Sequence, residues 1–156
     1  MIRYLLTVTL LAGLSGPALA ESCPVPQGWA KPARHVAART PNLRFALKPN
    51  SSAQLQLHPE PGVAVPLKKE RAKQPREFAG LAALEVLKAG KLEVALSGRA
   101  YVDLVRDGRA LESTAHGHKN CTGVAKTVAF DVKPGRYLVQ IADAKLRTIK
   151  VGFRTP

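Results

Sequence analysis

Two histidines one residue apart are the strongest candidates for chemistry in this sequence. His116 and His118 flank Gly117. Two imidazoles at this spacing can bind one metal ion if Gly117 lets the backbone turn, and Asp103 or Glu112 could add an oxygen ligand. The sequence therefore predicts a copper or zinc site as one hypothesis.

Two other interpretations of the histidines stay open. Lys119 places an ammonium group beside them, so they could be exposed loop residues next to a disulfide, or an acid–base pair. Ser113 lies close to His116 in sequence, but no nucleophile elbow, phosphate-binding loop, dinucleotide fingerprint or His-Glu-x-x-His helix is present. The residues leave catalysis uncertain and favour a non-enzymatic protein.

Asp103 is expected in the middle of a strand, on the same face as Tyr101 and Val105. If that face is the core, the carboxylate needs an ion pair or hydrogen bonds, and Arg106, Arg136 or the histidines could supply them. Asp103 is thus the third candidate metal ligand or a structural ion-pair partner.

The first twenty residues read as a signal peptide. Arg3 precedes an apolar run over residues 4–14, and Ala18-Leu19-Ala20 supplies a small-x-small cleavage site. A run of about eleven residues is shorter than the roughly 20 needed to cross a bilayer. We expect cleavage near Ala20, export to the periplasm or secretion, and no transmembrane segment in the mature chain.

Export changes what the two cysteines imply. In an oxidising compartment Cys23 and Cys121 are expected to form a disulfide. The bridge would close a loop of roughly 100 residues and contribute up to about 4.7 kcal/mol. Cys121 as a thiolate ligand or nucleophile is the alternative, and it leaves Cys23 without a role.

The chain is strongly basic, with 24 Lys and Arg against 11 Asp and Glu and a formal charge of +13. One basic connector holds much of the excess: Lys68, Lys69, Arg71, Lys73 and Arg76. Export and the scarcity of aromatic residues argue against nucleic acid. The expected partners are an anionic envelope component, such as lipid head groups or acidic glycans, or an acidic protein.

The mature chain divides into two regions. Residues 21–75 are rich in proline, which predicts loops with short edge strands at residues 44–47 and 54–57. Residues 76–156 alternate apolar and polar positions with a period of two, with turn residues at 107–108, 134–135 and 143–144. We predict an all-β protein, a small antiparallel β-sandwich of jelly-roll-like type with one disulfide.

An internal echo supports this fold. Residues 87–96 align with residues 132–141 as "apolar, Lys, small or Pro, Gly, basic" followed by alternation. The pattern predicts a glycine of positive φ in a type II turn, from which the next strand starts at once.

Residues 78–153 resemble the β-sandwich of the pre-peptidase C-terminal type, with residues 101–105 as its Asp-Leu-bearing strand. The chain is also similar to a family of small exported bacterial proteins of unknown function. The shared runs are Asp-Leu-Val-Arg-Asp-Gly at 103–108, His-Gly-His-x-x-Cys at 116–121 and Pro-Gly-Arg-Tyr at 134–137.

Some members of that family carry the name homogentisate dioxygenase, which would imply a small metal-dependent enzyme. Cupin-type iron sites follow His-x-His with a glutamate a few residues later, and residues 119–123 contain none. The residues therefore give the name little support.

Overall fold

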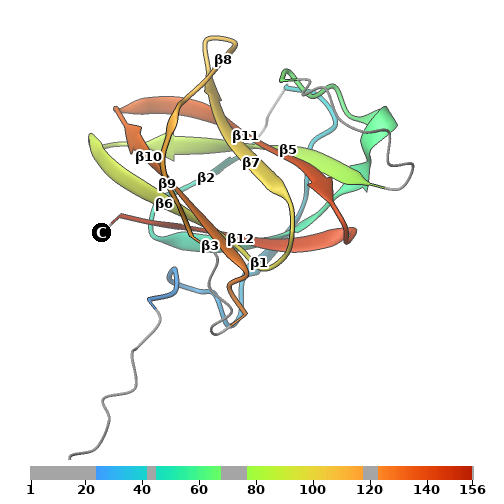
Figure 1. Ribbon diagram of the computed structural model, residues 1–156, viewed down its shortest axis with the longest axis horizontal. Helices are drawn as coiled ribbons and strands as arrows, with labels where there is room; N and C mark the ends of the chain where they lie inside the picture. The colour runs from blue at the N-terminus through green and yellow to red at the C-terminus, as the bar shows by residue number, and fades with distance from the viewer. Residues whose placement is uncertain (1–23, 42–44, 68–76, 118–122, 156) are drawn as a thin grey trace, which may run out of the picture.

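A computed structural model describes residues 24–41, 45–67, 77–117 and 123–155. Figure 1 shows its elements in chain order: β1 (Ala33–Val36), β2 (Ala46–Leu47), β3 (Ser51–Gln56), β4 (His58–Pro59), the 3-10 helix η1 (Glu60–Gly62), β5 (Phe78–Val86), β6 (Gly90–Leu96), β7 (Tyr101–Arg106), β8 (Arg109–Ala110), β9 (Ser113–Gly117), β10 (Lys126–Val132), β11 (Gly135–Ala144) and β12 (Thr148–Arg154).

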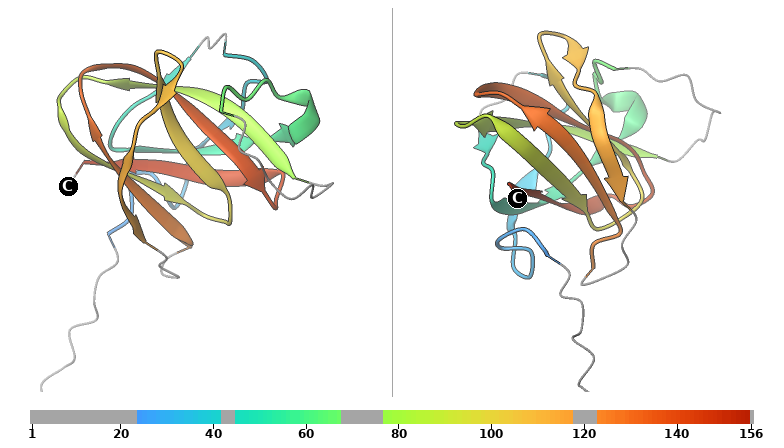
Figure 2. Two further views of the ribbon diagram at one scale, coloured as in Figure 1. Left: turned by 45° about the horizontal axis from the view of Figure 1, so that its top comes forward. Right: turned by 60° about the vertical axis from the view of Figure 1, so that its left-hand side comes forward.

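The strands form two sheets that pack face to face. One sheet, here the β12 sheet, has the order β1-β3-β12-β6-β10-β9, and the other, the β11 sheet, has the order β2-β5-β11-β7-β8. Alternate side chains of both sheets point into one apolar core, for example Leu92 and Val94 of β6 and Val139 and Ile141 of β11. The predicted all-β sandwich is confirmed, and the two layers are visible in Figure 2.

Eight strands pair as one antiparallel ribbon. β3 pairs with β12, β5 with β11, β6 with β10 and β7 with β8. The ribbon passes from one sheet to the other at each step, and the β12–β6 and β11–β7 pairings close the sheets. This wound ribbon is the two-Greek-key arrangement of a jelly roll.

The two halves of the sequence echo form one corner of that ribbon. Gly90 lies opposite Val132 in the β6–β10 pair, and Gly135 lies opposite Val86 in the β11–β5 pair. Each glycine starts its strand and has a positive φ, 153° and 141°, as the echo predicted. Both values exceed the roughly +80° of a type II turn, so the predicted turn type is wrong.

The N-terminal region supplies an inner strand of one sheet as well as edge strands. β2 lies at an edge of its sheet as expected, but β3 lies between β1 and β12, so the prediction of an edge strand at residues 54–57 is wrong. Residues 51–58 contain no proline, and every backbone N–H there is free to join a ladder. β1 and β2 also run parallel to their neighbours, β3 and β5, so the sheets are mixed.

Two segments cover the outer faces of the sandwich. On the β12 sheet, Trp29 is buried against Ala95 and Val124. On the β11 sheet, residues 60–67 pack over a small apolar cluster that includes Leu81 and Ala142. The part of the chain that is described contains no helix with the length and apolar character needed to cross a membrane.

Candidate functional site

A cavity of about 1110 Å³ is lined by residues from both sheets. Leu111, Val128 and Phe130 give it an apolar wall, and Ser113 and His116 lie on the β9 side. We refer to it as the β9 cavity. A hollow of this size with a few polar groups is the usual form of a small-ligand site.

A β-bulge aims two polar side chains of β9 toward this cavity. His116 pairs with Val128 and Ser113 pairs with Phe130, with a register shift between them. Without that shift, residues three apart would lie on opposite faces of the strand. Val128 and Phe130 belong to the core, so Ser113 and His116 share the inward face, where Ser113 Oγ and His116 Nε2 are hydrogen bonded at 2.8 Å.

Gly117 has a different role from the one expected. It lies within β9 and is not among the residues of positive φ, so it does not turn the chain. A Cβ at this position would lie 2.6 Å from Thr127 Oγ1. A larger residue at this position would therefore need the Thr127 hydroxyl to move.

Asp103 faces away from the core. Its neighbours Val102 and Leu104 are buried in the core, whereas Asp103 pairs in register with Gln140, whose face of β11 is covered by residues 60–67. The half-buried Asp103 lines the β9 cavity together with His116. Two of the three predicted metal ligands therefore line the same cavity.

The expected partner Arg106 is used elsewhere. Its guanidinium lies 3.9 Å from the Asp107 carboxylate and donates to the Pro134 carbonyl oxygen at 3.2 Å. It also lies over the Tyr137 ring, 5.4 Å from the centroid. Arg106 thus fastens the β7–β8 turn to the ribbon corner.

Cations and carboxylates share the remaining rim of the β9 cavity. Lys126 Nζ lies 5.0 Å from the centre of the Tyr101 ring and donates to the Ala100 carbonyl oxygen at 3.1 Å. Lys145 and Glu77 also line the cavity and form an ion pair. The cavity can therefore hold polar groups of either sign at its rim and an apolar group at its wall.

A carboxylate cluster that the sequence did not predict adjoins this rim. Oxygen atoms of Glu60, Glu77 and Asp143 lie within 4.8 Å of one another. The three residues come from distant parts of the chain, so no short sequence motif could have predicted the cluster. Because Lys145 pairs with Glu77, part of the negative charge is already neutralised.

A second hollow, of about 730 Å³, lies at the ribbon corner. Lys48, Lys88 and Lys91 line it, and we call it the lysine groove. The sequence echo contains Lys88 and Lys91, but nothing in the sequence indicates that Lys48 joins them.

Several predicted residues lie outside the described residues. They are the signal segment, both cysteines (Cys23 and Cys121), His118, and the basic connector Lys68, Lys69, Arg71, Lys73 and Arg76. The disulfide, the signal peptide and the complete ligand set therefore stay predictions.

Comparisons of the chain with protein-family models, with curated proteins and with solved structures find no significant match. Function has to be inferred from the residues and their geometry.

Proposed function

We propose that the protein is an exported, non-enzymatic β-sandwich that binds an anionic envelope component or an acidic protein through its basic side chains. The observation that carries the proposal is a set of basic side chains without an ion-pair partner among the described residues. They are Lys31, Arg34, Lys48, Lys88, Arg99, Arg109, Lys133 and Arg147. Unneutralised surface charge of one sign attracts polyanions and raises their association rates.

The fixed ends of the basic connector support the same proposal. Leu67, which precedes it, is held by two hydrogen bonds to the Gln140 side chain. Glu77, which follows it, pairs with Lys145, and its carbonyl oxygen accepts a hydrogen bond from the Glu60 N–H at 3.0 Å. The described residues on either side of positions 68–76 are thus both held in place by hydrogen bonds or an ion pair.

Salt-dependent retention on immobilised acidic glycan or anionic vesicles tests this function. Salt screens exposed charges over about 10 Å at 0.1 M, so retention of the wild-type protein should fall steeply as salt rises. Retention that does not change between low and high salt would reject the proposal.

A matched pair of variants assigns the effect to the connector. One variant replaces Lys68, Lys69, Arg71, Lys73 and Arg76 with Gln, and its control replaces Lys31, Arg34, Arg109, Lys133 and Arg147 with Gln. Both lose five positive charges. We expect both variants to lose retention, because both remove unneutralised positive charge, and the connector variant to lose more, because its five charges lie within nine consecutive residues. Equal losses would show that net charge acts and that the connector has no special part.

A second candidate function is metal binding at the β9 cavity. Its support is that the exposed His116 and the half-buried Asp103 line the same cavity and that the bulge in β9 places His116 on the same face of the strand as Ser113. Zinc or copper should then be found by elemental analysis of the exported protein, and His116→Ala with His118→Ala should abolish it.

His35→Ala is the matched control for that experiment, since His35 stacks on Phe45 away from the cavity. Protein purified without metal, or metal that persists in the double variant, would reject this candidate.

A further inference from the structure

The lysine groove is built by four parts of the chain that meet at the ribbon corner, one of which is Val132 at the end of β10. Lys48 and Asn50 come from the β2–β3 turn, Leu87 and Lys88 from the β5–β6 turn, and Thr155 from the segment after β12. Residues distant in sequence therefore place their cations around one hollow.

Two of the three ammonium groups are unneutralised. Neither Lys48 nor Lys88 has an ion-pair partner among the described residues. Lys91 Nζ lies 3.7 Å from the Asp131 carboxylate, with both side chains exposed. Glu85 is the acidic residue that lines the groove, so the lining keeps a positive excess.

The backbone around the groove is fixed. Asn50 has a positive φ of 55°, and its side-chain oxygen accepts hydrogen bonds from the Thr155 N–H and hydroxyl, both at 3.0 Å. The Lys48 carbonyl oxygen accepts a hydrogen bond from the Ser51 hydroxyl at 2.6 Å. The β2–β3 turn that holds Lys48 is therefore fixed before any ligand arrives, which lowers the cost of binding there.

An apolar side chain stands among these cations. Leu87 is 76% exposed, more than any other large apolar side chain in the described part of the chain. It precedes Lys88 at the tip of the turn and lines the same groove. An exposed leucine beside lysines matches a lipid surface, where phosphate meets the cations and acyl chains cover the apolar group.

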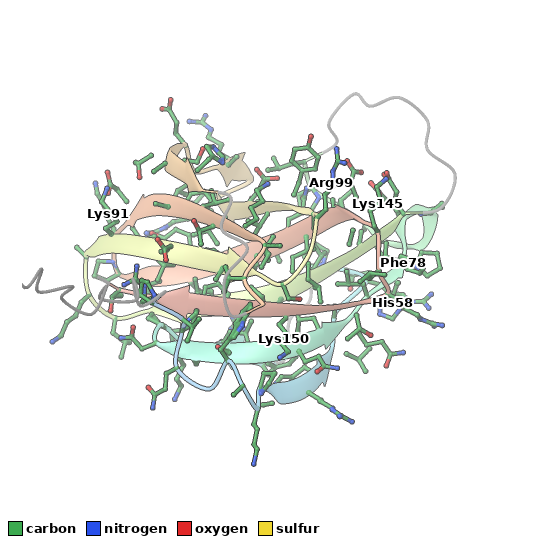
Figure 3. All side chains as sticks on the ribbon, turned by 60° about the horizontal axis from the view of Figure 1, so that its bottom comes forward. His58, Phe78, Lys91, Arg99, Lys145 and Lys150 are labelled. Carbon is green, nitrogen blue, oxygen red and sulfur yellow. The ribbon has the colours of Figure 1, made fainter. Side chains whose placement is uncertain are left out.

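We propose that the lysine groove docks the protein on an anionic phospholipid surface, with Lys48 and Lys88 at the lipid phosphates and Leu87 inserted between the lipids. The inference rests on the proposed affinity for anions and assigns it to lining residues that are not part of the basic connector. Figure 3 shows Lys91 at one end of the sandwich and Phe78 and Lys145, close to the connector's end, at the other.

Sedimentation with vesicles of phosphatidylglycerol and phosphatidylcholine tests the proposal, with phosphatidylcholine vesicles as the neutral reference. A lysine near an anionic surface contributes about fivefold in affinity, so Lys48→Gln with Lys88→Gln should weaken binding by about 25-fold. Lys31→Gln with Arg34→Gln removes the same charge from exposed positions on the β1 side and should have a much smaller effect.

Leu87→Ala tests the apolar part and should weaken vesicle binding by about tenfold, because it removes methyl and methylene groups that the lipid would cover. Leu146→Ala is its control, because Leu146 is 67% exposed and follows Lys145 at the opposite end. Equal losses for the groove variants and their controls would overturn the proposal.

Inorganic phosphate and a soluble sugar phosphate form the competing arm. Competition by either at millimolar concentration, with Leu87→Ala unchanged, would assign the groove to soluble phosphate esters and overturn lipid docking. If the connector variant loses vesicle binding and the groove variants do not, the proposed function stands and this inference fails.

Discussion

Gln140 forms two hydrogen bonds with the Leu67 backbone through its side-chain amide, an arrangement we call the clasp. Its N–H donates to the Leu67 carbonyl oxygen at 2.9 Å, and its carbonyl oxygen accepts from the Leu67 N–H at 3.0 Å. Gln140 is 1% exposed, so the clasp lies in a dry environment. It ties the segment over the outer face of the β11 sheet to the strand beneath.

Gln140→Leu should lower the free energy of unfolding by about 1–3 kcal/mol, because the Leu67 peptide groups lose their partners. Urea denaturation measures the change. Gln56→Leu, at an exposed position of β3, is the control and should shift stability by no more than about 0.5 kcal/mol. Equal stability for Gln140→Leu and wild type would show that the clasp contributes nothing.

Gly80→Ala should be destabilising by about 1–3 kcal/mol through overpacking. A Cβ at Gly80 would lie 2.4 Å from Ala37 Cβ and 2.8 Å from Leu57 Cδ2. Gly98→Ala is the matched change, since nothing lies within 4 Å of its Cβ and its φ is not positive. That variant should gain about 0.4–1 kcal/mol, so thermal melting should separate the two in opposite directions.

Trp29→Ala should cost about 3 kcal/mol of stability. The indole covers Ala95 and Val124, and Lys150 Nζ lies 5.8 Å from the ring and donates to the Trp29 carbonyl oxygen at 3.2 Å. Trp29 is the one tryptophan in the sequence. In the wild-type protein, Trp29 fluorescence should shift to longer wavelength at the same urea concentration at which β-structure is lost. A fluorescence shift at lower urea would mean that the N-terminal segment detaches first.

A disulfide between Cys23 and Cys121 should appear as a cross-linked peptide in exported protein digested without reductant. Replacement of both cysteines with Ser should lower stability by up to about 4.7 kcal/mol. Two free thiols in protein recovered outside the cytoplasm would contradict the predicted bridge.

Much of the fold could be predicted because its signal is local. The alternation over 101–106 and 126–132 corresponds to β7 and β10, and Asp107-Gly108 forms the expected two-residue turn, with φ values of 52° and 72°. The predicted turn at residues 143–144 is wrong. Asp143 has a φ of 50° in an irregular stretch of β11, and the strand continues to Ala144 instead of ending in a turn.

What could not be predicted depends on register between strands. Ser113 and His116 share a face only because β9 slips by one residue against β10, and no feature of residues 113–117 encodes that slip. Glu60 and Asp143 meet because the chain folds over the β11 sheet. The position of β3 inside its sheet likewise depends on β1, a strand too short to show clear alternation.

The place of β12 constrains how the protein can be made. It lies between β3 and β6, with Val151 paired to Ala53 on one side and Leu96 on the other. A nascent chain that still has residues 148–154 inside the ribosome therefore lacks the middle of one layer and leaves two ladders open. Folding of this sheet must therefore wait until residues 148–154 have been synthesised, and pairing over such long sequence separations is slow.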